Sequence, residues 1–247
     1  MSEQTARIAM WSGPRNISTA MMRSWGSRAD TFVTDEPLYA HYLRETGAEH
    51  PGRDEVIAHH EADLGKVMQW LTGPIPEDKR IWYQKHMAHH ITDLVRDGLG
   101  GWIGKLTNCF LIRDPGEMIT SYIKVVPEPT AADLGLPQQV ELFESERRRT
   151  GRVPPVLDSR DVLENPARMI GLLCDAIGIE FDEAMLSWEA GPRETDGMWA
   201  RYWYGSVEVS TCFSSYTAKD EAVPAQLKNV HEQCTALYEQ LAANRLR

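Results

Sequence analysis

The stretch that decides the fold is RIAMWSGPRNIST, residues 7–19, in which a short apolar run leads into a loop of small and polar side chains. The run Arg7–Trp11 has the length of an ordinary buried strand. A helix is predicted to begin near Ser18, because Met21 and Trp25 recur at the spacing of one helical face. Such a loop directs free backbone N–H groups and the positive end of the helix toward a phosphate or sulfonate. The segment therefore predicts an anion site.

More apolar runs of similar length follow, separated by amphipathic stretches. The predicted strands are Arg7–Trp11, Thr31–Thr34, Ile81–Gln84, Cys109–Ile112 and Val153–Leu157. Their alternation with helical stretches is typical of an α/β fold, in which helices connect the strands of a parallel sheet. We expect a three-layer sandwich whose central, mainly parallel five-stranded sheet is flanked by helices. No internal repeat or long linker is visible, so the chain (1–247) is predicted to form a single domain.

The charge balance restricts the class of partner. The 247 residues include 26 Lys and Arg against 36 Asp and Glu, which gives a net charge of -10. This balance disfavours a broad electrostatic surface for nucleic acid or anionic lipid. We therefore expect neither a nucleic-acid nor a membrane partner, and a local cluster of charges must hold any anionic ligand.

Cysteine usage and the absence of long apolar runs indicate a soluble cytoplasmic protein. The four cysteines are widely spaced, and none forms a Cys-x-x-Cys pair that would suggest a zinc or redox site. Buried free thiols are expected at Cys109, Cys174, Cys212 and Cys234. The N-terminus has no basic region followed by an apolar core, and no apolar run approaches the ~20 residues that cross a bilayer.

Capping residues mark two helix starts further along the chain. Asp114 and Asn165 are each followed by a proline, a combination that favours the first turn of a helix. The first of these helices is predicted to present apolar side chains on one face as far as Val126. The proline-containing segment 125–141 and the polar segment 45–78 are predicted to be surface connections or lids.

A second anion-binding pair is predicted where the fourth strand ends. Arg113 follows that strand directly, at the edge where open α/β sheets bind ligands. Ser121 comes eight residues later, two turns into the following helix. Together the two side chains offer a planar cation and a hydroxyl to an anionic group. Taken alone, Arg113 is as well explained as a surface salt-bridge partner of Asp114 or Glu117.

Three segments in this order resemble the sulfotransferase family, and in particular its divergent bacterial branch. They are the strand, loop and helix at 8–25, the RDP(x)₅S pattern within 110–124, and the strand, polar loop and helix at 156–179. The resemblance implies a P-loop-type fold and 3′-phosphoadenosine 5′-phosphosulfate (PAPS) as the sulfuryl donor.

The resemblance also assigns residues to the donor. The first loop would cradle the 5′-phosphosulfate, and Arg15 would in addition act on the group being transferred. The implied cradle residues are Arg15, Asn16, Ile17, Ser18 and Thr19. In the family an Arg followed eight residues later by Ser binds the 3′-phosphate, which assigns that role to Arg113 and Ser121.

Transfer to a hydroxyl also needs a base that removes the acceptor proton. Glu36 follows the second strand and resembles the proposed base of several non-cytosolic and bacterial members. Lys85 and His86 follow the third strand and resemble, with one residue fewer, the Lys-x-His of the cytosolic branch. Glu36 can instead be an ion-pair partner of Arg15 or Arg44. His86 can be a surface or helix-cap residue, and Lys85 can either stabilise the leaving phosphate or simply lie at a strand end.

No metal is expected. A histidine cluster is conceivable, but it lacks an acidic partner at a familiar metal-ligand spacing. Its members would be His59, His60, His86, His89 and His90. Sulfuryl transfer does not require a metal.

The segment 199–216 is rich in aromatic residues. Trp199, Tyr202, Trp203 and Tyr204 can wall an acceptor pocket or hold an organic cation by their π faces. Packing in the core is at least as good an explanation.

These features predict an enzyme that moves a sulfuryl group from PAPS to a hydroxyl or amine of a small-molecule acceptor. One alternative is an ATP-dependent P-loop phosphotransferase, although the loop lacks the Gly-Lys of that class. Another is a non-catalytic nucleotide-binding protein of the same fold. We expect a monomer or a homodimer. Core packing explains the amphipathic helix after Pro224 more readily than a coiled-coil dimer does.

Overall fold

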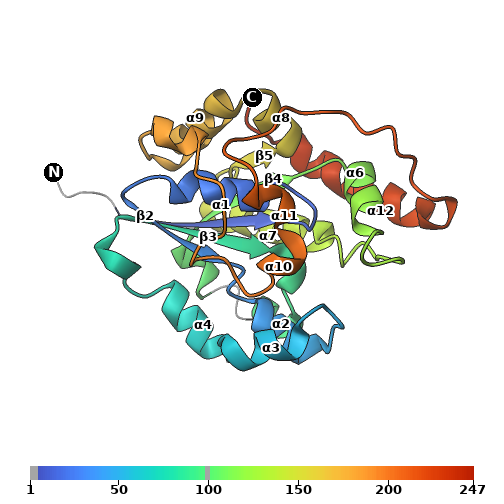
Figure 1. Cartoon of the computed structure of the whole chain (residues 1–247), viewed down its shortest axis with the longest axis horizontal. Coiled ribbons are helices and arrows are strands. Elements are labelled where there is room, and N and C mark those ends of the chain that lie inside the picture. The colour runs from blue at the N-terminus through green and yellow to red at the C-terminus, as the bar shows by residue number, and fades with distance from the viewer. Residues whose placement is uncertain (1–4, 98–100) are drawn as a thin grey trace.

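A computed structural model describes residues 5–97 and 101–247, and its centre is a parallel sheet in the order β2-β3-β1-β4-β5 (Figure 1). The strands are β1 (Ala6–Ser12), β2 (Thr31–Asp35), β3 (Ile81–Met87), β4 (Thr107–Ile112) and β5 (Val156–Asp158). The predicted α/β class and five-stranded sheet are confirmed. The predicted domain also includes residues 1–4 and 98–100, which lie outside the described residues.

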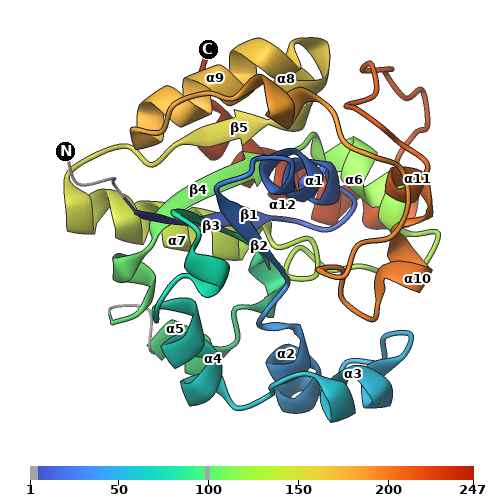
Figure 2. The ribbon, with the colours of Figure 1, turned by 60° about the vertical axis from the view of Figure 1, so that its left-hand side comes forward.

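Helices cover both faces of the sheet (Figure 2). One face carries α1 (Ser18–Gly26), α8 (Ser159–Glu164) and α9 (Pro166–Ile177). The other carries α4 (Leu64–Leu71), α5 (Asp93–Asp97), α6 (Pro115–Tyr122), α7 (Leu136–Thr150) and α12 (Lys228–Ala242). A separate apolar cluster joins α2 (Tyr39–Thr46), α3 (Arg53–His59), α10 (Ala200–Trp203) and α11 (Gly205–Glu208). The short 3₁₀ helices are η1 (Pro76–Asp78), η2 (Ala88–His90), η3 (Ile103–Lys105), η4 (Glu183–Leu186) and η5 (Ala225–Leu227).

Alternate side chains of each strand fill the two faces of the sheet. In β1, Ile8 and Met10 pack with α1 and α9, whereas Ala9 and Trp11 pack with the helices of the opposite face. All four side chains are fully buried. A parallel strand covered on both faces must be apolar along nearly its whole length, which is why these strands are visible in the sequence.

The ends of all five strands differ from those predicted, and two of them differ by three residues at one end. β3 continues past its predicted end and includes Lys85 and His86, which pair with β1. β5 begins at Val156, later than predicted, because Pro154 and Pro155 have no N–H to donate to the sheet. The longer β3 matters for function, since the two residues predicted to follow it are held rigidly in the sheet.

Both predicted helix starts are confirmed. The side chains of Asp114 and Asn165 each accept a hydrogen bond from a backbone N–H three residues on, at 3.0 and 3.2 Å. The prediction that α6 extends to Val126 is wrong, because the helix ends at Tyr122. Pro127 follows, and a proline disfavours helical geometry in the residue before it.

The two segments predicted as surface connections or lids contribute to the core. In 125–141, Leu134 is fully buried, and the side chain of Gln139 donates to backbone carbonyls at the ends of β1 and β4 at 2.9 and 3.2 Å. The segment 45–78 contains α3 and α4, and Leu71 of α4 is fully buried under the sheet. Both segments therefore pack against the sheet.

Three of the four thiols are buried, as predicted, and Cys212 is exposed instead. Within residues 5–97 and 101–247, no helix combines the length and the apolar composition that crossing a membrane requires.

The order of the strands reverses the direction of the chain between β1 and β4. These strands are neighbours, but the chain leaves them in opposite directions, toward β2 at one edge and β5 at the other. Ligands of open α/β sheets bind at such a point, beyond the carboxyl ends of the strands. Arg15 follows β1 and Arg113 follows β4, so both cations lie at this point.

Candidate functional site

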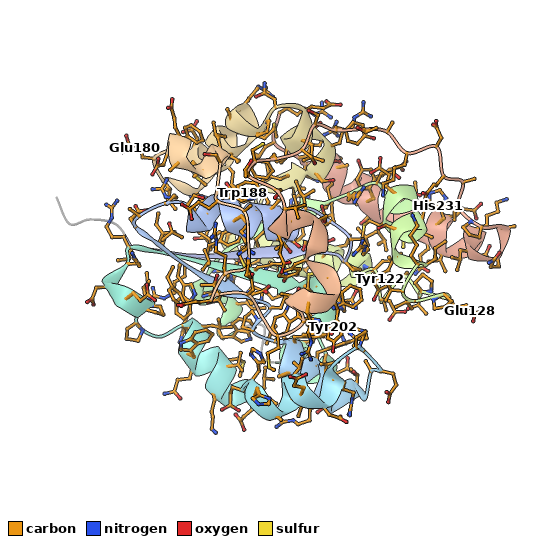
Figure 3. The ribbon with its side chains drawn as sticks, viewed as in Figure 1. Tyr122, Glu128, Glu180, Trp188, Tyr202 and His231 are labelled. Carbon is orange, nitrogen blue, oxygen red and sulfur yellow. The ribbon has the colours of Figure 1, made fainter. Side chains whose placement is uncertain are left out.

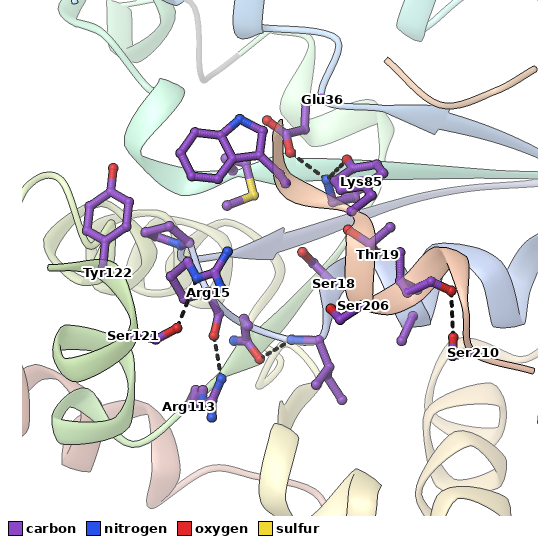
Figure 4. A pocket seen from close by; sticks show the side chains of 18 of the residues that line it. Arg15, Ser18, Thr19, Glu36, Lys85, Arg113, Ser121, Tyr122, Ser206 and Ser210 are labelled. Atoms are coloured by element: carbon purple, nitrogen blue, oxygen red, sulfur yellow. Dashed lines mark hydrogen bonds and ion pairs between the residues drawn. The ribbon is translucent and has the colours of Figure 1, made fainter. Parts of the chain in front are cut away.

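A cavity of about 440 Å³ opens at the carboxyl ends of the central strands (Figure 4). Its walls come from the loop after β1, the ends of β2, β3 and β4, helix α6, and the segment from α10 to Lys219. The predicted site residues that line it are Arg15, Asn16, Ile17, Ser18, Thr19, Glu36, Lys85, Arg113 and Ser121. His86 does not line it.

The loop after β1 has a shape that depends on specific residues. A Cβ on Gly13 would lie 2.4 Å from the carbonyl oxygen of Leu134, so no larger residue fits. Arg15 adopts left-handed backbone geometry with φ 57°, which is rare outside glycine and often found at functional sites. The Asn16 side chain accepts from the next backbone N–H at 2.8 Å and donates to Leu111 O at 3.1 Å. The loop thereby holds the first residues of α1 on the cavity wall.

The guanidinium of Arg15 carries a positive charge that has no carboxylate within ion-pair distance among the described residues. Its Nε donates to Ser121 Oγ at 2.9 Å, and its carbonyl oxygen accepts from Arg113 Nη1 at 2.5 Å (Figure 4). Burial lowers the pKa of Arg15, and the neighbouring Arg113 cation lowers it further. The three residues that the sequence assigned to anion binding are thus in direct contact.

Arg113 is also an ion-pair partner, as the alternative interpretation predicted. Its Nε and Nη2 donate to Glu117 Oε2 at 3.0 and 2.8 Å. Tyr216 donates to the other oxygen of Glu117 at 2.7 Å. Asp114 is not the partner, because its side chain caps α6. An anion at Arg113 would therefore compete with Glu117.

A buried lysine joins two acids on the opposite wall of the cavity. Lys85 Nζ donates to Asp35 Oδ1 at 2.8 Å, to Glu36 Oε1 at 2.5 Å and to the hydroxyl of Tyr204 at 2.7 Å. Tyr204 donates in turn to Asp35, whose Oδ2 also accepts from Gly197 N at 2.9 Å. Asp35 and Lys85 are paired across β2 and β3, so the sheet itself sets this geometry.

The cluster shifts the charges of its members. Burial raises the pKa of Glu36, the nearby Asp35 raises it further, and Lys85 partly opposes both. Burial by itself lowers the pKa of Lys85, but Asp35, Glu36 and Tyr204 together raise it well above its ordinary value. Glu36 also has left-handed backbone geometry, with φ 42°. The site thus holds a permanent cation beside a carboxylate that is more basic than usual.

The alternative partners predicted for Glu36 are wrong. Its carboxylate binds Lys85, and neither Arg15 nor Arg44 forms a recorded ion pair with it within the described chain. The side chain of Lys85 is 1% exposed, and its ammonium group makes three hydrogen bonds. Lys85 is therefore part of the site, and the alternative that it simply lies at a strand end is wrong.

His86 lies on the other face of the sheet. Its ring stacks on Trp11 with centroids 4.3 Å apart, and its Nε2 is 3.3 Å from Gln84 Oε1. Burial lowers its pKa to about 3. The side chain is neither a surface residue nor a helix cap, because β3 carries it into the core. Side chains alternate along a strand, so β3 can present only one of Lys85 and His86 to the cavity.

The histidines do not form a metal centre in the described part of the chain. No group of three or more His, Cys, Asp or Glu side chains within it could hold an ion.

The aromatic segment divides between the two roles predicted for it. Trp203, Tyr204 and Phe213 line the cavity. Trp199 is 2% exposed in the cluster under α2 and α3, and Tyr202 of α10 is 44% exposed (Figure 3). Core packing is therefore confirmed for Trp199, whereas the role of the cavity-lining members as an acceptor wall stays a prediction.

Several residues of the site were not identified from the sequence. Asp35, which binds Lys85 behind the cavity wall, ends a strand directly before Glu36, and that position was the available signal. Tyr204 was recognised only as one of several aromatic residues. Lys219 lines the cavity, and its pKa is lowered by burial and by the nearby Arg113 cation. No local pattern marks Lys219, because it lies in an irregular segment.

The chain is similar to known proteins in both sequence and structure. The family model described as a sulfotransferase domain matches residues 6–240. Branched-chain-amino-acid aminotransferase-like proteins 2 and 1 of Arabidopsis thaliana are 34% and 36% identical to this chain over 236 and 238 residues. The match covers 94% of this chain in each case, but the chain spans about 40% of the length of these curated relatives.

Solved structures share the fold over nearly the whole chain. The sulfotransferase domain of the curacin biosynthetic pathway has a TM-score of 0.53 at 14% identity, covering 98% of this chain and 99% of its own. The sulfotransferase domain of the Synechococcus PCC 7002 olefin synthase has a TM-score of 0.57 at 17% identity, covering 98% and 97%. A sulfotransferase from Alicyclobacillus acidocaldarius has a TM-score of 0.54 at 12% identity, with the same coverage of 98% and 97%. At these identities the likeness concerns the fold.

Proposed function

This chain belongs to the sulfotransferase domain family, and on that premise we propose that it transfers a sulfuryl group from PAPS to a hydroxyl or amine of a small-molecule acceptor. The observation that carries the proposal is the contact between Arg15, Ser121 and Arg113 at one end of the cavity, with the Lys85 and Glu36 cluster opposite. The cavity thus has cations on one side for the two anionic groups of the donor, and a base on the opposite side for the acceptor. We propose that the chain forms a single sulfotransferase domain.

The donor would be held by the loop after β1 and by α6. The start of α1 supplies backbone N–H groups and hydroxyls of Ser18 and Thr19 for the phosphosulfate. Arg113 and Ser121 would bind the 3′-phosphate, since a guanidinium and a hydroxyl can donate several charge-assisted hydrogen bonds to it. Arg15 lies between the two groups and has no carboxylate partner among the described residues, so its charge is available to the transferring sulfuryl oxygens.

Glu36 is the residue we propose as the base. It lines the cavity, and its raised pKa makes it a better proton acceptor than an exposed carboxylate. Lys85 holds Glu36 Oε1 and can stabilise negative charge on the leaving phosphate. His86 is excluded from this role in the proposal because its ring lies on the far face of the sheet.

A phosphotransferase acting on ATP with Mg²⁺ is less well supported. The loop lacks the Gly-Lys pair of that class. Asp158, which ends β5, does not line the cavity, because it caps α8 and accepts from Tyr238 at 2.5 Å. A non-catalytic nucleotide-binding protein would bind the same nucleotide without turnover.

The experiment measures binding and turnover separately. Calorimetry with adenosine 3′,5′-bisphosphate (PAP), compared with ATP and Mg²⁺, tests the donor site. Labelled PAPS with a panel of small alcohols, phenols and amines tests transfer. Preference for ATP and Mg²⁺ would support the phosphotransferase, and PAP binding without transfer to any acceptor would support the non-catalytic alternative.

A further inference from the structure

His90 is a buried histidine that faces the cavity beside Glu36. It is the last residue of η2, its side chain is 1% exposed, and neither ring nitrogen has a hydrogen-bond partner in the described part of the chain. The rings of Tyr39 and Tyr42 stack on it, each with centroids 4.8 Å away. Buried polar atoms are nearly always hydrogen-bonded, so two unpaired nitrogens on one ring at a cavity wall need an explanation.

The ring of His90 is neutral and has one N–H to donate. Burial lowers the pKa of His90 well below its ordinary value, and the nearby His89 lowers it further, so one nitrogen carries a proton and the other does not. His90 Nε2 faces Glu36 Oε2 at 3.9 Å. A carboxylate oxygen at this position favours the proton on Nε2. The distance is too long for a direct hydrogen bond, but one further atom can bond to both groups.

We propose that His90 and Glu36 together hold the acceptor oxygen, and that the acceptor class of this site is therefore hydroxyl compounds and not amines. The inference deepens the proposed sulfuryl transfer and rests on it. His90 would touch the substrate, with its Nε2–H donating, while Glu36 Oε2 accepts.

The number of lone pairs separates the two acceptor classes. A hydroxyl donates its hydrogen to Glu36, accepts from His90 with one lone pair, and keeps the second for attack on sulfur. A neutral amine has one lone pair, and a hydrogen bond from His90 would occupy the pair needed for attack. The donor and acceptor placed at this position thus match a hydroxyl.

The step balances without a further reactant. A bond forms between the acceptor oxygen and sulfur, and the bond from sulfur to the bridging phosphate oxygen of PAPS breaks. The electron pair of the broken bond stays on that phosphate oxygen, and the hydroxyl proton passes to Glu36. The products are a sulfate monoester and PAP.

The test compares three variants with the unchanged protein. His90→Phe keeps the aromatic stack but removes the donor, and His90→Gln restores an N–H. The matched control is His60→Phe, because His60 also packs on an aromatic ring, Trp199, and has an unpartnered buried Nε2, but lies outside the cavity. The acceptor probes are the pairs benzyl alcohol with benzylamine and phenol with aniline.

We expect the alcohol and phenol to be sulfated at least tenfold faster than the matched amines. His90→Phe should lower kcat/KM for the hydroxyl probes at least tenfold while KM for PAPS and the affinity for PAP change less than twofold. His90→Gln should recover part of the loss, and His60→Phe should behave as the unchanged protein. Equal rates for matched amine and hydroxyl probes, or an unaffected His90→Phe, would overturn the inference.

A second measurement keeps this result separate from failure of the proposed function. If the unchanged protein sulfates no probe, transfer itself is refuted, and ¹⁵N spectra of the histidine rings then decide the role of His90. A His90 signal, assigned by its loss in His90→Phe, that moves with benzyl alcohol in the presence of PAP but not with benzylamine supports the hydroxyl site. A signal that moves with neither probe overturns it.

Discussion

Glu117 holds the guanidinium of Arg113 through two hydrogen bonds, at 3.0 and 2.8 Å, one turn into the helix that follows β4. The same guanidinium reaches back to the carbonyl oxygen of Arg15. Arg113 thus lines the cavity while it is paired with an acid, and any phosphate bound there would have to compete with that acid. The first two predictions follow from this pair.

Arg113→Ala should weaken PAP binding. The lost charge-assisted hydrogen bonds correspond to about 1.5–3 kcal/mol, or roughly 10- to 150-fold in Kd. Calorimetry measures the change, with Arg148→Ala on the exposed face of α7 as the matched control. An affinity within twofold of the unchanged protein would reject Arg113 as the 3′-phosphate ligand.

Glu117→Gln should strengthen PAP binding. The amide can still accept from Tyr216, but it no longer competes as an anion for Arg113. A partly exposed pair of this kind contributes about 0.2–1 kcal/mol, so we expect up to a fivefold lower Kd. Weaker binding would instead show that Glu117 is needed to orient Arg113.

Arg15→Ala should impair turnover more than binding. If the charge acts on the group being transferred, its removal costs the transition state more than the ground state. We expect kcat to fall by about 100-fold, with less than a fivefold change in Kd for PAP. Single-turnover kinetics separate the two effects, and an unchanged kcat would remove Arg15 from catalysis.

Glu36→Gln should lower turnover by about 10²- to 10⁴-fold, the contribution of a general base. The affinity for PAP should not fall. The variant should be no less stable at neutral pH. The folded state raises the pKa of Glu36, so the protein loses stability as pH rises from the ordinary carboxyl value of 4.5 through the folded pKa. Glutamine does not ionise, and this loss is then absent. Denaturation at pH 7.5 checks stability, and a folded variant with normal turnover would refute Glu36 as the base.

The pH profile gives an independent test of Glu36. The base must be ionised, so kcat should decrease as pH falls through the raised pKa of Glu36, above the ordinary carboxyl value of 4.5. Glu36→Asp should keep residual activity, and the pH at which its kcat decreases on the acid side of the profile should shift if this side chain is the base. An acid limb at or below 4.5 would contradict the assignment.

His86→Phe should make the protein less sensitive to acid. Burial lowers the pKa of His86 from 6.5 to about 3 in the folded protein. Between these two pH values the unfolded chain binds a proton at His86 and the folded chain does not. The stability of the protein therefore falls as pH falls below 6.5. One such histidine lowers the free energy of unfolding by about 1.4 kcal/mol for each pH unit below 6.5. Urea denaturation at pH 7.5 and 5.5 should show that difference, with His231→Phe on α12 as control (Figure 3). Equal acid sensitivity would contradict the prediction.

Much of this protein could be predicted from short stretches of sequence, because the signals are local. The strand, loop and helix around Ser18, and the caps at Asp114 and Asn165, depend on backbone groups within four residues of one another. Apolar runs mark the strands, since burial on both faces excludes polar residues from their interiors. These features also located Arg15 and Arg113, which follow two of the strands directly.

Tertiary structure alone decided which side chains meet. Lys85 contacts Asp35 from 50 positions away and Tyr204 from 119 away, and no local pattern encodes those distances. The extent of β3 decided between Lys85 and His86, because alternation in a strand sends neighbours to opposite faces. Folding also brought His90 to within 3.9 Å of Glu36 while leaving both of its ring nitrogens without a hydrogen-bond partner in the described chain. Burial then shifted the pKa values, since the cost of charge depends on the solvent removed by distant parts of the chain.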